Sequence, residues 1–186
     1  MDEDEMSAII RRGLPGRPMV AGVAGGVGTT TVARAVGGID RGVFTGRIVD
    51  VLVCRATGDS LIRAARAAQL VVAAGGVRPV LAVCAAGASG PSRPTAARMR
   101  LLEPHTAAVV VLPYVRRWRD MAVPLDDVTG LLTRPLTELP RTLRRYAAAA
   151  GHLHGVLEGA TPPRRAAAPR HVSAVRIHPS TTRSQR

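Results

Sequence analysis

The chain has 186 residues, which is enough for one α/β domain with a substantial core but too few to predict two. All 26 basic residues are arginine, and the net charge of +13 favours a polyanionic partner or an acidic membrane surface. No apolar stretch approaches the length of a membrane span, which excludes a membrane-spanning protein at this stage.

Residues 1–18 begin with the acidic run Asp2, Glu3, Asp4 and Glu5 and carry no sustained periodicity. This composition predicts a disordered lead-in. An acidic opening is also unlike the cationic start of a secretory signal, so we expect a cytoplasmic protein.

A glycine loop follows between a predicted strand at residues 19–24 and a predicted helix at residues 30–36. This layout is typical of a phosphate-binding site, because glycines let the backbone approach an anion and the amides of the following helix point at it. The candidate nucleotide-binding residues are Gly25, Gly26, Val27, Gly28, Thr29, Thr30 and Thr31.

The run Gly25-Gly26-Val27-Gly28 followed by Thr30-Thr31 resembles the deviant phosphate loop of the ParA/MinD partition and positioning ATPases. In that family the run reads Lys-Gly-Gly-Val-Gly-Lys-Thr-Thr, so Ala24 and Thr29 stand where the family has its two lysines. The resemblance implies ATP or ADP as ligand and Thr30 as the residue that holds Mg²⁺. Without the lysines, we expect nucleotide binding to be weak or lost. The alternative is a glycine turn that only packs a strand against a helix.

Residues 38–47 are too short to hold the strands and switch loops that the family inserts there, with the aspartates that contact magnesium and the attacking water. We interpret Asp40 as a polar turn residue and Asp59 as a helix cap. Asp50 lies at the wrong end of its predicted strand for a site at the carboxyl edge. We therefore assign no catalytic residue and expect weak or no hydrolysis.

Further strands are predicted at residues 48–54, 80–84 and 107–113, and further helices at residues 60–74, 95–102 and 136–157, the last interrupted early by Pro140. Four apolar strands alternating with helices predict a three-layer α/β domain at residues 19–158, P-loop NTPase-like or Rossmann-like, with a mainly parallel sheet. The glycine loop should then share the carboxyl edge of the sheet with residues 55–59, 85–92 and 114–117. Cys54 and Cys84 each end an apolar run and are interpreted as core thiols.

The first functional hypothesis is a degenerate ParA/MinD-like nucleotide-binding protein acting in partitioning, conjugation or positioning of cargo. Arginine would supply the missing charge, and Arg34 is the nearest candidate in sequence. The second hypothesis is a non-enzymatic adaptor, a pseudo-ATPase that binds nucleic acid or an acidic protein partner, or forms a homodimer. Its basis is the basic tail at residues 159–186, predicted to be disordered, together with Arg141, Arg144 and Arg145.

Overall fold

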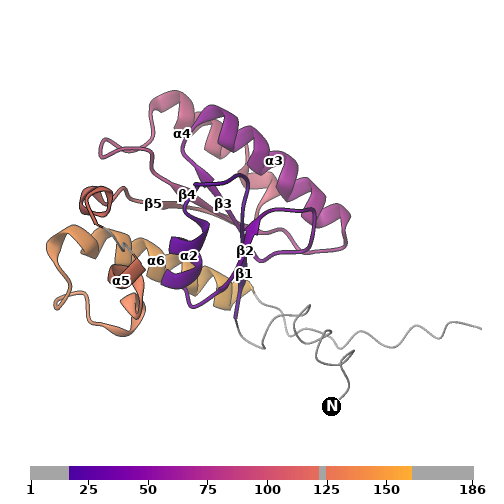
Figure 1. The fold of residues 1–186 in the computed structure, drawn as a ribbon. Helices are drawn as coiled ribbons and strands as arrows, with labels where there is room; N and C mark the ends of the chain where they lie inside the picture. The colour runs from indigo at the N-terminus through magenta and orange to yellow at the C-terminus, as the bar shows by residue number, and fades with distance from the viewer. Residues whose placement is uncertain (1–16, 122–124, 161–186) are drawn as a thin grey trace, which may run out of the picture.

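The computed structural model describes residues 17–121 and 125–160, except for the side chain of Ala160. In Figure 1 a five-stranded sheet lies between two groups of helices. The strands are β1 (Met19–Gly22), β2 (Ile39–Val43), β3 (Val51–Arg55), β4 (Val80–Cys84) and β5 (Ala108–Leu112). The α-helices are α2 (Thr29–Ala35), α3 (Gly58–Ala73), α4 (Arg93–Arg100), α5 (Leu125–Val128) and α6 (Arg141–Ala160). Short 3₁₀ turns are η1 (Glu103–His105), η2 (Arg116–Arg119) and η3 (Leu131–Thr133).

The sheet has the order β2-β1-β3-β4-β5, and every neighbouring pair of strands is parallel. Helices α3 and α4 cover one face, whereas α2, α5 and α6 cover the other (Figure 1). The chain leaves β1 toward β2 in one direction and continues from β3 to β5 in the other, so right-handed crossovers place helices on both faces. The predicted three-layer, Rossmann-like α/β fold is confirmed.

The strand β2 is a feature that the sequence analysis missed. Residues 38–47 are too short for both another strand and a helix, so the sequence predicts four strands. The structure has five. The connection from β2 to β3, residues 44–50, contains no helix. Parallel strands are usually joined by a crossover of a dozen or more residues. Seven residues in extended form reach about 23 Å, which is enough to return along a five-residue strand.

The three central strands form the interior of the sheet because both of their faces are covered. Every residue of β1 is buried, as are the first four residues of β3 and of β4. Among them Val20, Leu52 and Leu81 have no measurable solvent exposure. At the amino edge, the Asp50 carboxylate accepts a hydrogen bond from the backbone amide of Met19 at 2.7 Å. This bond ties the start of β3 to the start of β1, away from the glycine loop.

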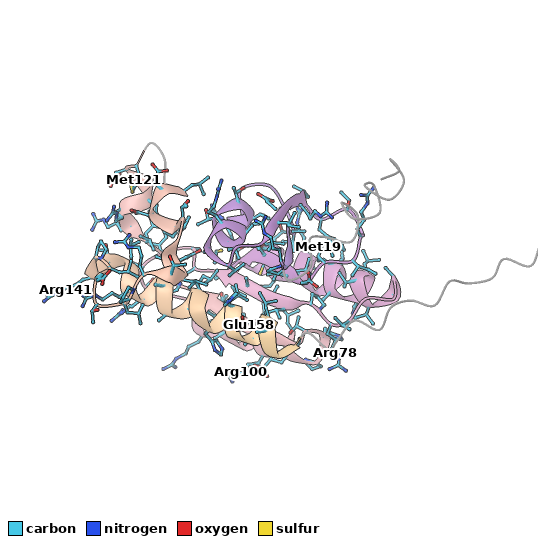
Figure 2. The ribbon with its side chains drawn as sticks, turned by 90° about the horizontal axis from the view of Figure 1, so that it is seen from below. Met19, Arg78, Arg100, Met121, Arg141 and Glu158 are labelled. Carbon is cyan, nitrogen blue, oxygen red and sulfur yellow. The ribbon has the colours of Figure 1, made fainter. Side chains whose placement is uncertain are left out.

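Helix α6 begins at Arg141, five residues later than the periodicity from Leu136 predicted. Proline lacks an N–H and is tolerated only near a helix start, so Pro140 sets this boundary. Leu136 is 48% exposed rather than buried. Arg144 donates hydrogen bonds to the carbonyls of Leu139 and Thr137, both at 3.0 Å, and so holds the preceding turn against the helix. Figure 2 shows α6 running from Arg141, on the side of Met121, toward Glu158.

The predicted disordered lead-in and tail fall largely on residues 1–16 and 161–186, outside the described residues. Arg17 is described, and it donates hydrogen bonds to the carbonyls of Gly37 at 2.8 Å and Gly38 at 3.1 Å. Arg17 thus packs against the turn that follows α2. Within the described ranges, no helix has the length and apolar character needed to cross a bilayer.

Candidate functional site

The segments that follow the parallel strands meet at the carboxyl edge of the sheet. Beyond β1, the amide of Val23 donates to the carbonyl of Val53 at 2.9 Å. Beyond β3, the amide of Ala56 donates to the carbonyl of Cys84 at 2.9 Å, and beyond β4 the amide of Ala85 donates to the carbonyl of Leu112 at 2.9 Å. The prediction that the glycine loop shares an edge with the segments after β3, β4 and β5 is confirmed.

The glycine loop, residues 23–28, joins β1 to α2 and has a backbone that only glycine adopts readily. Gly26 has φ +70° and Gly28 has φ +99°, both in the left-handed region. Gly28 is the N-cap of α2 and offers no side-chain cap. The amides of Gly25, Gly26 and Gly28, like those of Thr29 and Thr30, donate no hydrogen bond to any described residue. The loop therefore presents several backbone donors without acceptors, as an anion-binding loop does.

Close packing inside the loop involves Gly22, which the sequence analysis did not single out. A Cβ atom on Gly22 would collide with Thr29 Oγ1 and lie 2.7 Å from Val27 Cγ2. The Thr29 side chain, at the position of the family's lysine, is thus turned inward over the end of β1. Thr30, at the proposed magnesium position, is exposed, and Thr31 is half-buried. Thr29 supplies neither charge nor reach to a phosphate.

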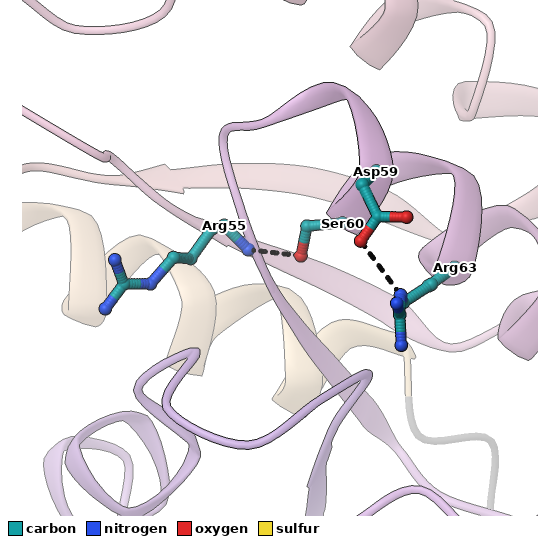
Figure 3. A network of polar contacts seen from close by, with 4 residues as sticks. All are labelled: Arg55, Asp59, Ser60 and Arg63. Atoms are coloured by element: carbon teal, nitrogen blue, oxygen red, sulfur yellow. Dashed lines mark hydrogen bonds and ion pairs between the residues drawn. The ribbon is translucent and has the colours of Figure 1, made fainter.

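The arginine that contacts the loop is Arg55, the last residue of β3. Its Nε and Nη2 atoms both donate to the carbonyl oxygen of Gly26, at 3.1 Å and 2.9 Å. Figure 3 shows the Arg55 side chain extending away from Ser60, whose hydroxyl accepts the Arg55 amide at 2.9 Å. Arg34, the candidate from sequence, lies exposed in the last turn of α2, at the end away from the loop. Distance along the chain was a poor guide because β3 pairs directly with β1.

The aspartates considered as metal ligands are engaged elsewhere. Asp40 lies within β2 rather than in the predicted turn, and its carboxylate accepts the amide of Gly42 at 2.7 Å. The prediction that Asp59 caps α3 is wrong. The N-cap is Thr57, and Asp59 pairs with Arg63 at 3.0 Å (Figure 3). No group of three or more His, Cys, Asp or Glu side chains suited to a metal ion lies within residues 17–121 and 125–160. The surroundings of the loop fit a phosphate group, but Thr30 alone is a poor magnesium site.

The thiol of Cys84 lies beneath the loop, because a Cβ on Gly28 would come within 3.3 Å of its sulfur. Burial raises the pKa of this thiol to about 12, although the positive charge of Arg55 acts in the opposite direction. Burial, with a smaller contribution from Cys84, also raises the pKa of Cys54 to about 12. Both cysteines are free, and both thiols are neutral at physiological pH. They are packing groups rather than nucleophiles, in agreement with the sequence interpretation.

A second polar cluster follows β5, within residues 114–127, for which the sequence predicts no regular helix or strand. The carboxylate of Asp127 accepts hydrogen bonds from Arg117 at 2.8 Å and from the indole N–H of Trp118 at 2.9 Å. Trp118 packs edge-on against Tyr146 of α6, with ring centroids 4.7 Å apart. The Tyr146 hydroxyl is buried and bonds to no described atom. Asp127 thereby joins α5 to η2, and Trp118 joins η2 to α6. Periodicity does not reveal these contacts.

Replacing Asp127 with alanine should loosen this cluster, because it leaves the Trp118 indole and the Arg117 guanidinium without their acceptor. We expect a loss of about 1–3 kcal/mol in the free energy of unfolding. Trp118 is the chain's single tryptophan, so its fluorescence emission should shift to longer wavelength in the folded variant. The neighbouring exposed residue Asp126, changed to alanine, is the control, and equal effects of the two changes would contradict this account.

Comparison of the chain with protein-family models, with curated proteins and with solved structures finds no match.

Proposed function

We propose that the protein binds the phosphate groups of an adenine nucleotide, ATP or ADP, weakly at the glycine loop, with little or no hydrolysis. The observation that carries this proposal is the position of the loop. It lies at the carboxyl ends of β1 and β3, where the direction of strand addition reverses, and ligands of open α/β sheets bind at such points. The unpaired loop amides and the Arg55 guanidinium make the same place suited to an anion.

Weak hydrolysis follows from what the loop lacks. Phosphoryl transfer depends on charge neutralisation by lysine and magnesium and on a positioned water molecule. Thr29 replaces the lysine, and the three aspartates Asp40, Asp50 and Asp59 have partners away from the loop. When bound, Mg²⁺ would neutralise phosphate charge, and Thr30 is the side chain that would contact it, although alone it makes a poor site. This combination supports a degenerate, ParA/MinD-like nucleotide-binding protein, which on that resemblance would act in partitioning, conjugation or cargo positioning.

Nucleotide titration of the full chain tests the proposal. We expect the wild-type protein to bind ATP weakly by calorimetry and to show negligible phosphate release. Changing Thr29 to lysine adds the missing charge at the loop and should tighten ATP binding by tenfold or more, since one good charged contact contributes about 1.5–3 kcal/mol. The control is Thr142→Lys, which adds the same charge at an exposed position on α6.

Two results would count against this function. ATP turnover by the wild-type protein, abolished in Thr30→Ala, would show that the loop is catalytically intact. If neither the wild-type protein nor the Thr29→Lys variant bound ATP or ADP at millimolar concentration, the nucleotide proposal would be wrong.

A second candidate is the non-enzymatic adaptor, which the charge of the described residues favours. Residues 17–121 and 125–160 contain 18 arginines and nine acidic residues, so the basic character is not confined to the tail. Arg141 and Arg145 are exposed on α6, whereas the Arg144 side chain donates hydrogen bonds to backbone carbonyls. Duplex DNA binding that falls steeply with salt, in a protein that binds no nucleotide, would support this candidate over the first. If the adaptor instead binds an acidic protein or a second copy of the chain, we expect no DNA binding.

A further inference from the structure

Arg55 is the last residue of β3, and hydrogen bonds hold both its backbone and its side chain. Its backbone amide donates to the hydroxyl of Ser60, a buried residue in the first turn of α3. Its guanidinium makes two hydrogen bonds to one carbonyl oxygen, that of Gly26. The residue therefore joins the start of α3 to the glycine loop. This link does not depend on a ligand.

The two bonds to Gly26 fix the orientation of a peptide plane. In a trans peptide the carbonyl and the following N–H point in opposite directions, so the Val27 amide points away from Arg55. Gly26 can hold this orientation because its φ of +70° is unstrained only for glycine. Without the guanidinium, the Gly26 carbonyl would lose both hydrogen bonds that fix its orientation, and the arrangement of the neighbouring loop amides should change.

The charge of Arg55 is also not neutralised by the nearest acid along the chain. Asp59 is four residues away, but its carboxylate pairs with Arg63, on the far side of Ser60 from the Arg55 side chain (Figure 3). Of the five N–H donors of a guanidinium, two bond to Gly26, and the others bond to no described residue. A positive charge with spare donors thus lies beside a loop from which the lysines are missing.

We propose that Arg55 is the positioning residue of the glycine loop, and that it supplies the positive charge toward a phosphate group that Thr29 cannot supply. The charge part of this inference rests on the proposed function, whereas the positioning part does not. An arginine at the end of the adjacent strand would replace, from across the sheet, a lysine normally placed within the loop.

The test compares the full-length wild-type protein with Arg55→Ala, Arg55→Lys and the control Arg66→Ala. Arg66 is an exposed arginine on the outer side of α3, so its removal makes the same change in net charge. In the absence of ligand, amide resonances and hydrogen exchange of residues 25–29 should change in Arg55→Ala and stay unchanged in Arg66→Ala. Arg55→Lys restores one donor and should recover part of the wild-type pattern. Loop amides unaffected by Arg55→Ala would overturn the positioning role.

Titration with ATP tests the charge part on the same four proteins. Binding should weaken at least tenfold in Arg55→Ala, recover partly in Arg55→Lys and remain at the wild-type level in Arg66→Ala. Equal affinity of wild-type and Arg55→Ala would overturn the charge part. If the wild-type protein binds no ATP while its loop amides still depend on Arg55, the proposed function fails and the positioning role stands.

Discussion

The protein should lose stability steeply as the pH rises above 9, because its two buried thiols must ionise when it unfolds. Burial raises the pKa of Cys54 and of Cys84 from 9.0 to about 12. Between these values the unfolded chain releases protons that the folded chain retains, so the stabilisation is complete below pH 9 and is lost as the pH approaches 12. Each tenfold difference in proton affinity between the folded and unfolded chain corresponds to about 1.4 kcal/mol, so the two thiols together should give a readily measured loss.

Urea unfolding at pH 8, 9.5 and 11, followed by circular dichroism, measures this slope. Cys54→Ala should be somewhat less stable at pH 8, because it leaves a small cavity, but its stability should fall less between pH 9.5 and 11. Cys84→Ala should flatten the slope in the same way. Burial also raises the pKa of Tyr146, so some slope should remain when both thiols are gone. A variant lacking Cys54 with the full wild-type slope would show that this thiol is not held neutral.

A methyl group on Gly22 should destabilise the loop, because the space beside it is already filled by Thr29 and Val27. We expect Gly22→Ala to lower the free energy of unfolding by about 1–3 kcal/mol, the usual cost of overpacking. Adding Thr29→Ala removes one of the two clashing atoms, so the double variant should lose less stability than the sum of the two single changes.

Gly25→Ala is the matched control for this series. A Cβ on Gly25 meets no atom within 4 Å, and its φ is not in the left-handed region, so we expect a change within about 0.5 kcal/mol. Chemical denaturation of the wild-type protein and the four variants gives the comparison. Equal losses for Gly22→Ala and Gly25→Ala would mean that the packing beneath the loop differs from the one described.

The sheet could be predicted from sequence wherever its strands are covered on both sides. The strands β1, β3 and β4 consist mainly of Val, Leu, Ala and Cys, and each was located to within three residues. The strand β2 was missed because its sequence, Ile-Asp-Arg-Gly-Val, lies at the sheet edge and is partly exposed, so selection for apolar residues is relaxed there. The absence of a following helix removed the second signal.

The site was predictable only in part, for a related reason. The glycine loop could be recognised because turns with positive φ require glycine, which is visible in sequence. The contact between Arg55 and Gly26 could not, because it joins residues 29 apart through a strand pairing that must be known first. The bond between Trp118 and Asp127 crosses from one short element to another, and neither element has a periodic pattern.

The pairing of the strands has a consequence for how the chain assembles. Partner residues in the four strand pairs are between 20 and 31 positions apart, so every pairing closes a loop of similar length at a similar entropic cost. No strand pairs with a segment from the far end of the chain, which keeps the contact order moderate. Both neighbours of β1 are present once residue 55 has been synthesised. The glycine loop and the arginine that holds it can therefore come together before β4 and β5 have been added to the sheet.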